Sequence, residues 1–160
     1  MPQRIAWATG KRGVEDAFLA AEADTAAYSG QVGKARELSR RAVASAQNAE
    51  ERETAAAYEA SAALRETLFG YRAEARKLAT AALERSRGRD VEYQAALALA
   101  LIGEAPRVQA LANDLSKQFP EDTIVQFKEL PALHALLALN RNEPSKAIEA
   151  LQPATPTNWE

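Results

Sequence analysis

The sequence predicts an all-α protein built from about four helix–turn–helix hairpins. Its 160 residues include 37 alanines and 17 leucines but only six valines and four isoleucines, and this composition favours helices over strands. Gly30, Gly70 and Gly103 each separate two alanine-rich stretches, and Asn142 stands at a fourth such point. Glycine and asparagine are the residues that most often end a helix in the left-handed conformation. These four residues therefore mark the turns of four hairpins.

A ladder of alanines at fixed distances from the four turns supports the same register. The positions seven before, five after and twelve after each turn are Ala23, Ala63, Ala96, Ala135, Ala35, Ala75, Val108, Ala147, Ala42, Ala82, Leu115 and Ala154. Ten of these twelve are alanine, where composition alone would place about three. Stacked helix pairs approach most closely where side chains are small. The ladder therefore favours stacked hairpins over a chance pattern in an alanine-rich chain.

The turns divide the chain into eight expected helices. Pro106 and Pro144 fit this division, because each falls in a first helical turn, where a missing N–H costs nothing. The helices are expected, in pairs, at residues 15–29 and 33–48, 50–69 and 72–87, 91–102 and 105–119, and 123–140 and 143–152. Residues 15–154 form the expected repeat domain. Residues 1–14 are interpreted as the remnant of a preceding helix and turn, and 155–160 as a truncated tail, so that we expect a segment of a longer protein.

Local signals predict several helix ends. Gly88 is expected to end one helix and Asp90 to cap the next. Thr123 and Gln126 have the spacing of a capping box. Pro131 falls inside an apolar helical stretch, where it must either kink the helix or mark its true start. The sequence does not choose between these two outcomes.

Composition and charge exclude several classes of function. Twenty basic and 22 acidic residues give a net charge of −2, so no overall field attracts nucleic acid or an anionic membrane. The absence of cysteine excludes disulfides, thiolate metal sites and cysteine nucleophiles. No apolar run reaches the roughly 18 to 20 residues that span a bilayer, which predicts no membrane insertion. The compartment stays open, either cytoplasmic or on the outer side of a membrane-anchored parent protein.

The chain offers no constellation of catalytic residues. A kinase centre needs a glycine-rich loop, a strand lysine and two aspartates in known motifs, and these motifs are missing from the sequence. The Gly-Lys-Arg-Gly stretch at residues 10–13 is interpreted as an ordinary loop. His134 is the only histidine, and a lone histidine on an apolar helix is more often a packed residue than a metal ligand. We therefore predict no catalytic, cofactor-binding or metal-binding residues and no cofactor.

Basic side chains gather on two of the expected helices. Arg36, Arg40 and Arg41 belong to the second helix of the first hairpin, and Arg72, Arg76 and Lys77 to that of the second. Stacking could align them as a stripe for an acidic or phosphorylated partner, or for nucleic acid. Glutamates interleave with them, at Glu37, Glu74 and Glu84. The favoured interpretation is therefore a solvated face with ion pairs between helical neighbours.

The repeat pattern resembles the tetratricopeptide repeat. The resemblance rests on a glycine between paired helices, small residues at three fixed offsets, and Pro120, which closes a hairpin. The usual Trp, Leu and Tyr anchors are absent, and two of the three spacings of 40, 33 and 39 residues exceed the roughly 34 residues of that family. The resemblance implies a right-handed superhelical array of hairpins whose first helices line a concave side.

Specific segments look like the tetratricopeptide-rich C-terminal region of bacterial eukaryotic-like serine/threonine protein kinases. These segments are residues 23–30, 34–42, 117–123, 130–132 and 146–149. Similar arrays follow winged-helix domains in bacterial transcription regulators. The resemblance implies a non-catalytic interaction or scaffolding domain of a signalling protein, with any kinase activity in a domain outside this chain.

The expected concave side would carry a partner-binding surface. Its residues are Asp24, Tyr28, Leu64, Thr67, Tyr93, Leu97, Leu136 and Asn140. Such a surface suits an amphipathic helix or an extended apolar segment of a protein or peptide partner. The alternative is that Leu64, Leu97 and Leu136 are simply core between helices. A second hypothesis for the function is self-association into homo-oligomers through the ends of the array, and nucleic-acid binding is not expected.

Overall fold

The computed structural model describes residues 10, 11 and 13–154, and within this part the chain forms helices and no strand. The all-α prediction is confirmed. The helices are α2 (Glu15–Tyr28), α3 (Val32–Asn48), α4 (Arg52–Leu68), α5 (Arg72–Arg85), α6 (Arg89–Leu101), α7 (Ala105–Gln118), η1 (Val125–Glu129), α8 (Leu130–Asn140), α9 (Pro144–Leu151) and η2 (Gln152–Ala154). The interpretations of residues 1–9 and 155–160 lie outside the described residues.

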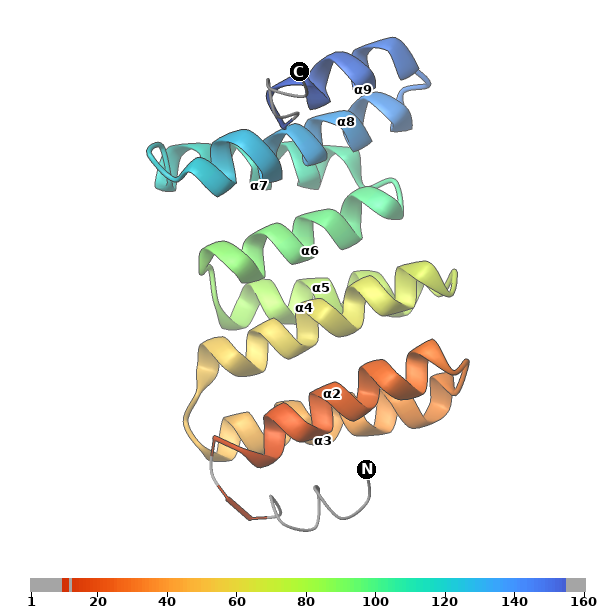
Figure 1. Ribbon diagram of the computed structural model, residues 1–160, viewed down its shortest axis with the longest axis vertical. Coiled ribbons are helices and arrows are strands. Elements are labelled where there is room, and N and C mark those ends of the chain that lie inside the picture. Colours follow the sequence, from red (N-terminus) through yellow and green to blue (C-terminus); the bar gives the residue numbers. More distant parts are fainter. Residues whose placement is uncertain (1–9, 12, 155–160) are drawn as a thin grey trace, which may run out of the picture.

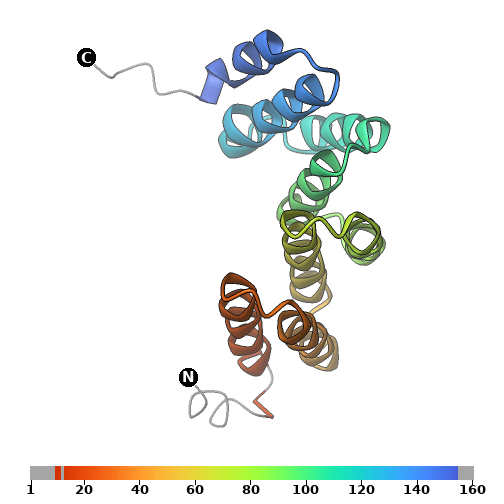
Figure 2. The ribbon, with the colours of Figure 1, turned by 90° about the vertical axis from the view of Figure 1, so that its right-hand side faces the viewer.

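The eight α-helices among the described residues pair into the four predicted hairpins. The pairs α2–α3, α4–α5, α6–α7 and α8–α9 follow one another along the long axis of the molecule (Figure 1). We call them hairpins 1 to 4. Figure 2 shows the same stack turned by 90°, with the second helices α3, α5 and α7 towards its right-hand side. The first helices α4 and α6 pack directly on each other and join hairpins 2 and 3.

All four predicted turn residues have the left-handed conformation. Their φ angles are +74° at Gly30, +80° at Gly70, +84° at Gly103 and +60° at Asn142. At Gly70 the amide donates to the carbonyl of Thr67 at 3.0 Å, and the next amide donates to that of Glu66 at 2.9 Å. This pair of hydrogen bonds is a Schellman motif, which satisfies the last carbonyls of a helix. The same pair recurs at the other three turns.

The alanine ladder is buried where the hairpins pack. Eleven of its twelve residues are exposed by 5% or less, and Ala154, in the short η2 helix, is half-buried. The largest buried cluster extends from Ala63 of α4 to Leu137 of α8, and a second cluster fills hairpin 1. Small side chains at fixed offsets therefore let neighbouring helices approach closely.

Pro131 is the second residue of α8, directly after a π-helical turn. The helical segment runs unbroken from residue 123 to residue 140, and residues 125–129 form a π-helical turn. In this turn the amide of Leu130 donates to the carbonyl of Val125, five residues back. The wider ring accommodates a residue that has no N–H to donate and whose ring would crowd an ordinary α-helical turn.

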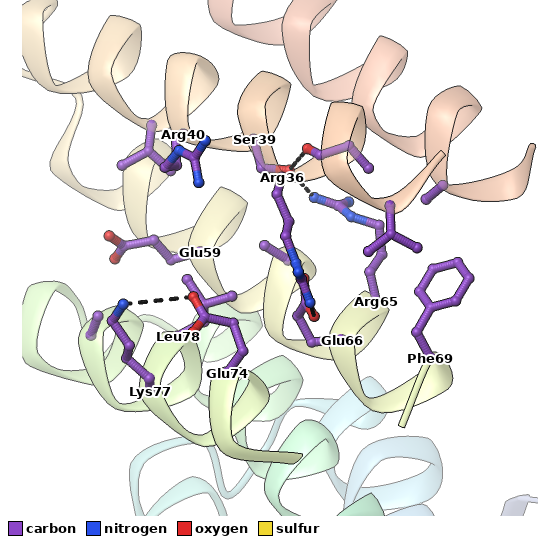
Figure 3. Close-up of a pocket in the computed structure, with 16 residues that line it drawn as sticks. Arg36, Ser39, Arg40, Glu59, Arg65, Glu66, Phe69, Glu74, Lys77 and Leu78 are labelled. Atoms are coloured by element: carbon purple, nitrogen blue, oxygen red, sulfur yellow. Dashed lines mark hydrogen bonds and ion pairs between the residues drawn. The ribbon is translucent and has the colours of Figure 1, made fainter. Parts of the chain in front are cut away.

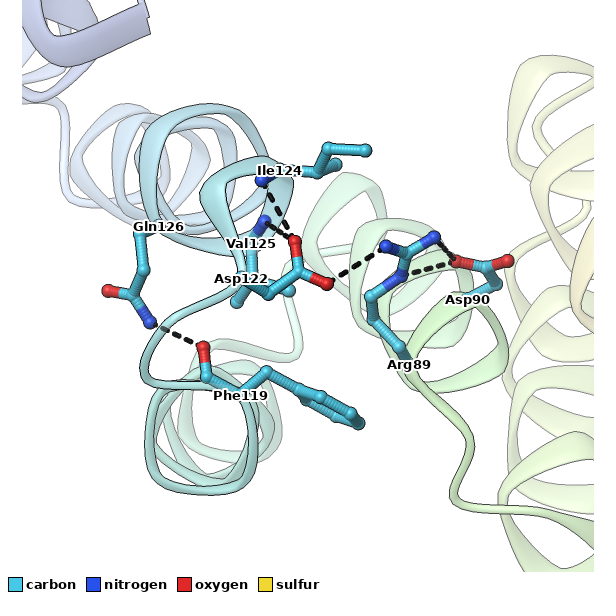
Figure 4. Close-up of polar contacts among 7 residues, drawn as sticks. All are labelled: Arg89, Asp90, Phe119, Asp122, Ile124, Val125 and Gln126. Atoms are coloured by element: carbon cyan, nitrogen blue, oxygen red, sulfur yellow. Dashed lines mark hydrogen bonds and ion pairs between the residues drawn. The ribbon is translucent and has the colours of Figure 1, made fainter.

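Two predicted caps differ from the structure. Asp122, not Thr123, caps the helix of hairpin 4, because its Oδ1 accepts the amides of Ile124 at 2.9 Å and Val125 at 3.1 Å (Figure 4). Gln126 does not complete a capping box, since its amide nitrogen donates to the carbonyl of residue 119. The predicted capping box is therefore wrong by one residue.

The turn between α5 and α6 also differs from the prediction. Helix α5 already ends at Arg85, and Gly88 precedes α6 with φ −62° instead of ending a helix. Asp90 lies within the first turn of α6, where it pairs with Arg89 at 2.7 Å and makes no cap hydrogen bond. A Cβ at residue 88 would lie 1.8 Å from Oε1 of Glu53, so this exposed side chain would have to move if glycine were replaced.

Candidate functional site

A groove opens between α3 and α5, with α4 as its floor (Figure 3). We call it the α3–α5 groove, and its cavity volume is about 270 Å³. Both flanking helices pack on α4 far more than on each other. Its apolar lining consists of Ala27, Val32, Ala35, Val43, Ala62, Phe69, Leu78 and Ala81. Five of these eight residues belong to the flanking helices, so each wall presents an apolar surface.

Small residues create the space between the two flanking helices. Ala35 and Ala62 are buried at the base of the groove, where a longer side chain would fill it. Val43 on α3 and Ala81 on α5 are half-buried, so both can be reached from solvent. The groove therefore has an apolar base and walls whose apolar atoms are partly exposed.

An arginine and a glutamate close one end of the groove. Arg36 of α3 binds Glu66 of α4 in a two-pronged ion pair, with Nε–Oε1 at 2.8 Å and a terminal nitrogen to Oε2 at 2.7 Å. The guanidinium also lies 4.4 Å from the ring centre of Tyr71. The hydrogen bonds to Glu66 raise the pKa of Arg36 above its ordinary value. This pair is fixed by planar geometry and joins hairpin 1 to hairpin 2.

A second arginine, Arg65 of α4, holds the same junction. Arg65 donates to Oγ of Ser39 at 2.7 Å and forms an ion pair with Asp24. A smaller cavity of about 110 Å³ lies beside this contact and is also lined by Tyr58. The hydroxyl of Tyr58 donates to Oδ2 of the buried Asp16 at 2.8 Å. Burial is the main cause that raises the pKa of Tyr58, and its bond to this carboxylate adds to it.

The opposite end of the groove carries a buried carboxylate. Glu59 of α4 is only 8% exposed and accepts two hydrogen bonds from Arg85 of α5, at 3.0 and 2.9 Å. These hydrogen bonds raise the pKa of Arg85. Because its charge is already compensated, Glu59 has little capacity left for a cationic ligand.

Arg40 is the cation of the rim whose charge is not compensated. It is exposed on α3 and makes no ion pair within the part of the chain that the structure describes. Across the groove, Lys77 of α5 pairs loosely with Glu74 at 3.6 Å. The rim therefore offers a solvated guanidinium beside an apolar base, an arrangement suited to an apolar ligand that carries an acidic group.

Four of the eight residues predicted to bind a partner pack against the core. Leu64, Tyr93, Leu97 and Leu136 are half-buried and contact the largest buried cluster. Burial raises the pKa of the Tyr93 hydroxyl. These side chains belong to the first helices of hairpins 2, 3 and 4, where they fill space between neighbouring hairpins.

The other four predicted residues lie near the turns. Tyr28 is 97% exposed, and Asp24 pairs with Arg65 as described. The hydroxyl of Thr67 donates to a carbonyl of its own helix at 2.6 Å, and the amide of Asn140 donates to the carbonyl of residue 100 at 2.9 Å, across hairpins 3 and 4. None of the eight lines the α3–α5 groove.

Three of the six residues in the two basic clusters, Arg36, Arg76 and Lys77, form ion pairs among the described residues. Arg76, which corresponds to Arg36 in the next hairpin, pairs with Glu104 of hairpin 3. The predicted pairing between helical neighbours occurs at Lys77 and Glu74. Most arginine pairs therefore join successive hairpins.

The described residues contain no cluster of three or more His, Asp or Glu side chains that could hold a metal ion. His134 lies exposed on α8. Within the same residues, no helix has both the length and the apolar character needed to cross a bilayer.

Comparison with known proteins identifies no relative. No family model matches the chain, and neither a curated protein nor a solved structure does. The functional argument therefore depends on the geometry of the hairpin stack and its surface.

Proposed function

We propose that this chain is a helical-repeat interaction module that binds an apolar segment of a partner protein in the α3–α5 groove. The observation that carries the proposal is the groove itself, which combines an apolar base and walls with one unpaired arginine on its rim. Hydrogen bonds from Arg36 and Arg65 join α3 to α4, and those from Arg85 join α5 to α4, so both walls are fixed to the floor of the groove. A preformed groove binds without an ordering cost to the module.

The chemistry of the groove favours a helix or an extended segment with an acidic residue. Two helical walls with small side chains at the base accept an apolar ridge in the manner of helix-in-groove recognition. An aspartate or glutamate beside that ridge would pair with Arg40. A free carboxylate terminus fits less well, because the other cations of the rim, such as Arg36 and Arg65, are already paired within the module.

The sequence resemblance supports a narrower proposal about context. It makes the module a scaffolding or regulatory domain attached to a bacterial serine/threonine protein kinase, with a winged-helix transcription regulator as the alternative parent. It also makes the hairpin stack a right-handed tetratricopeptide-like superhelix. This context is tested separately from the groove. A partner is recovered from the source cell, and its binding is compared with and without an attached kinase domain.

The experiment uses peptides selected from a displayed random library against the purified chain. Val43→Glu and Ala81→Glu place a carboxylate on each wall and should weaken a selected peptide at least roughly tenfold, which corresponds to about 1.4 kcal/mol. Glutamate is a good helix former, so the fold should persist. Ala44→Glu, on the exposed neighbouring position of α3, is the matched control and should leave the affinity unchanged. Equal affinities for all three variants would disprove the groove assignment.

The unpaired arginine gives an independent test of the same site. Arg40→Glu should weaken selected peptides that contain an acidic residue and spare those that lack one. Titration by fluorescence anisotropy at low and high salt measures both classes, since an exposed ion pair is screened by salt. An equal loss of affinity for both classes of peptide would instead show that Arg40→Glu disturbs the fold.

A further inference from the structure

The apolar lining of the α3–α5 groove lies in two parts, on either side of one ion pair. Arg36 of α3 reaches across to Glu66 of α4, and Figure 3 shows Leu78 and Phe69 on opposite sides of this pair. We call the part that contains Val43, Leu78 and Ala81 the inner part, and the part nearer the hairpin turns, which contains Ala27, Val32 and Phe69, the outer part.

The outer part is open to solvent, like the inner part. Phe69 is 40% exposed, and Val32 is half-buried. An aromatic ring that is both exposed and beside an apolar base offers a large contact surface to a ligand. A ligand that filled only the inner part would leave this ring in water.

The distance between the two parts sets the length of a ligand that fills both. Val32 and Val43 belong to the same helix and are eleven positions apart, which corresponds to roughly 16 Å at the rise of an α-helix. A partner helix covers this distance in about three turns, so two of its side chains on one face reach both parts. An extended segment would cover it in about five residues.

The polar groups of the groove favour the helix over the extended segment. Glu59 and Glu66 are compensated by arginines, and the hydroxyl of Ser39 donates to a carbonyl of its own helix at 2.7 Å. Beyond the first turns of α3 and α5, the backbone groups of the walls are hydrogen-bonded within each helix. An extended segment would lose water from its peptide groups without finding partners for them, whereas a helix pairs its own peptide groups.

The uncompensated charge on the rim lies nearer to the inner part. Arg40 is eight positions after Val32 and three before Val43 on α3. An acidic residue of the partner would therefore face Arg40 when it stands about one turn away from the side chain that fills the inner part. This charge complementarity fixes the position of the acidic residue in the partner segment.

We propose that the occupant of the α3–α5 groove is an amphipathic helix of about three turns, with one apolar side chain in each part and an acidic residue one turn from the inner one. The inference rests on the proposed function and adds the conformation, length and pattern of the partner segment. The two apolar side chains stand about eleven residues apart in the partner, because the two parts have this spacing along α3.

The test uses a 20-residue peptide selected from a displayed random library against the purified chain, then made with ¹³C and ¹⁵N labels. The bound peptide should show helical Cα chemical shifts over about three turns. Phe69→Ala and, independently, Val32→Glu should weaken it at least roughly tenfold. A carboxylate in the first turn of a helix is favourable, so Val32→Glu should leave α3 intact. Leu68→Ala is the matched control, because this leucine is 79% exposed beside Phe69 and does not line the groove.

Two results would overturn the inference and leave the proposed function standing. The first is that Phe69→Ala and Val32→Glu bind the peptide like the parent while Val43→Glu weakens it, since the peptide would then fill the inner part alone. The second is extended chemical shifts in a peptide that Val43→Glu weakens. If neither Val43→Glu nor Ala81→Glu changes the affinity, the groove itself is not the binding site and both proposals fail.

Discussion

Glu50 has a left-handed backbone at a position where the hairpin turns use glycine or asparagine. Its φ is +64°, and its amide and that of Glu51 complete a Schellman motif with the carbonyls of Gln47 and Ala46. The sequence predicted a helix from residue 50, whereas α4 begins at Arg52. Glutamate gives no signal for this conformation, because a Cβ in the left-handed region costs roughly 1–2 kcal/mol.

Replacing Glu50 by glycine should therefore stabilise the protein. Relief of the backbone strain outweighs the roughly 0.5–1 kcal/mol that glycine loses to the unfolded chain, so the free energy of unfolding should rise by about 0.5–1 kcal/mol. Urea denaturation measures it. Glu37→Gly, on the exposed middle of α3, is the control and should lower stability by about 1 kcal/mol. A loss of stability at both positions would contradict the assigned turn.

Glu129 is a buried carboxylate without full compensation. It is 7% exposed in the π-helical turn, and its Oε2 has no hydrogen-bond partner among the described residues. Burial raises its pKa; the charges of Asp90 and Asp122 also raise it, and that of Arg89 lowers it. The Tyr93 hydroxyl of α6 also interacts with it. The folded protein therefore binds a proton at Glu129 more strongly than the unfolded chain does.

This difference predicts how Glu129→Gln should depend on pH. A raised pKa in the folded state means that the free energy of unfolding decreases as pH rises above the ordinary pKa of about 4.5. Glutamine does not ionise, so the variant should be more stable than the parent at pH 7, and this advantage should shrink towards pH 4. Thermal unfolding at several pH values tests it, with the exposed Glu121→Gln as control. An advantage that is constant from pH 4 to 7 would contradict the account.

At the scale of elements, the entry to hairpin 4 depends on one aspartate. Asp122 caps the helix and forms an ion pair with Arg89 of α6 at 3.0 Å (Figure 4). Hydrogen bonds from the Val125 amide and from Arg89 lower the pKa of Asp122. The same residue thus begins the helix and ties hairpin 3 to hairpin 4.

Asp122→Ala should lower the free energy of unfolding by about 1–2 kcal/mol, as expected for the loss of a good N-cap. Thr123→Ala is the matched control and should change it by less than about 0.5 kcal/mol, because the hydroxyl of Thr123 is not the cap. Urea denaturation at neutral pH compares the two variants. A larger loss of stability in Thr123→Ala than in Asp122→Ala would contradict this assignment and support the capping box that the sequence predicted.

At the scale of the whole molecule, the sequence predicted the hairpins well because their signals are local. Left-handed turn residues and small side chains at fixed offsets act within one repeat. The ion pairs between hairpins join residues far apart in the sequence, such as Arg36 and Glu66, which are 30 positions apart. No fixed spacing in the sequence predicts these pairs. The side of the stack on which a groove opens depends on the distance between α3 and α5, which no single repeat determines.

The candidate site shows the same division between local and long-range information. The sequence predicted a binding surface on the first helices, with Leu97 and Leu136 among its residues, and these leucines contact the core. The groove residues Val43 and Leu78 stand at different distances from their turns, so no repeat pattern selects them. Only the packing of hairpins 1 and 2 brings them to one groove.

The most direct test of the account is a methyl NMR titration of the chain with a selected peptide. The α3–α5 groove contains Val32, Val43 and Leu78, whereas Leu97 and Leu136 report on the first-helix side that the sequence favoured. We predict saturable shifts at the three groove residues, with Leu97 and Leu136 unchanged. Shifts confined to Leu97 and Leu136 would contradict the groove and place binding on the first helices.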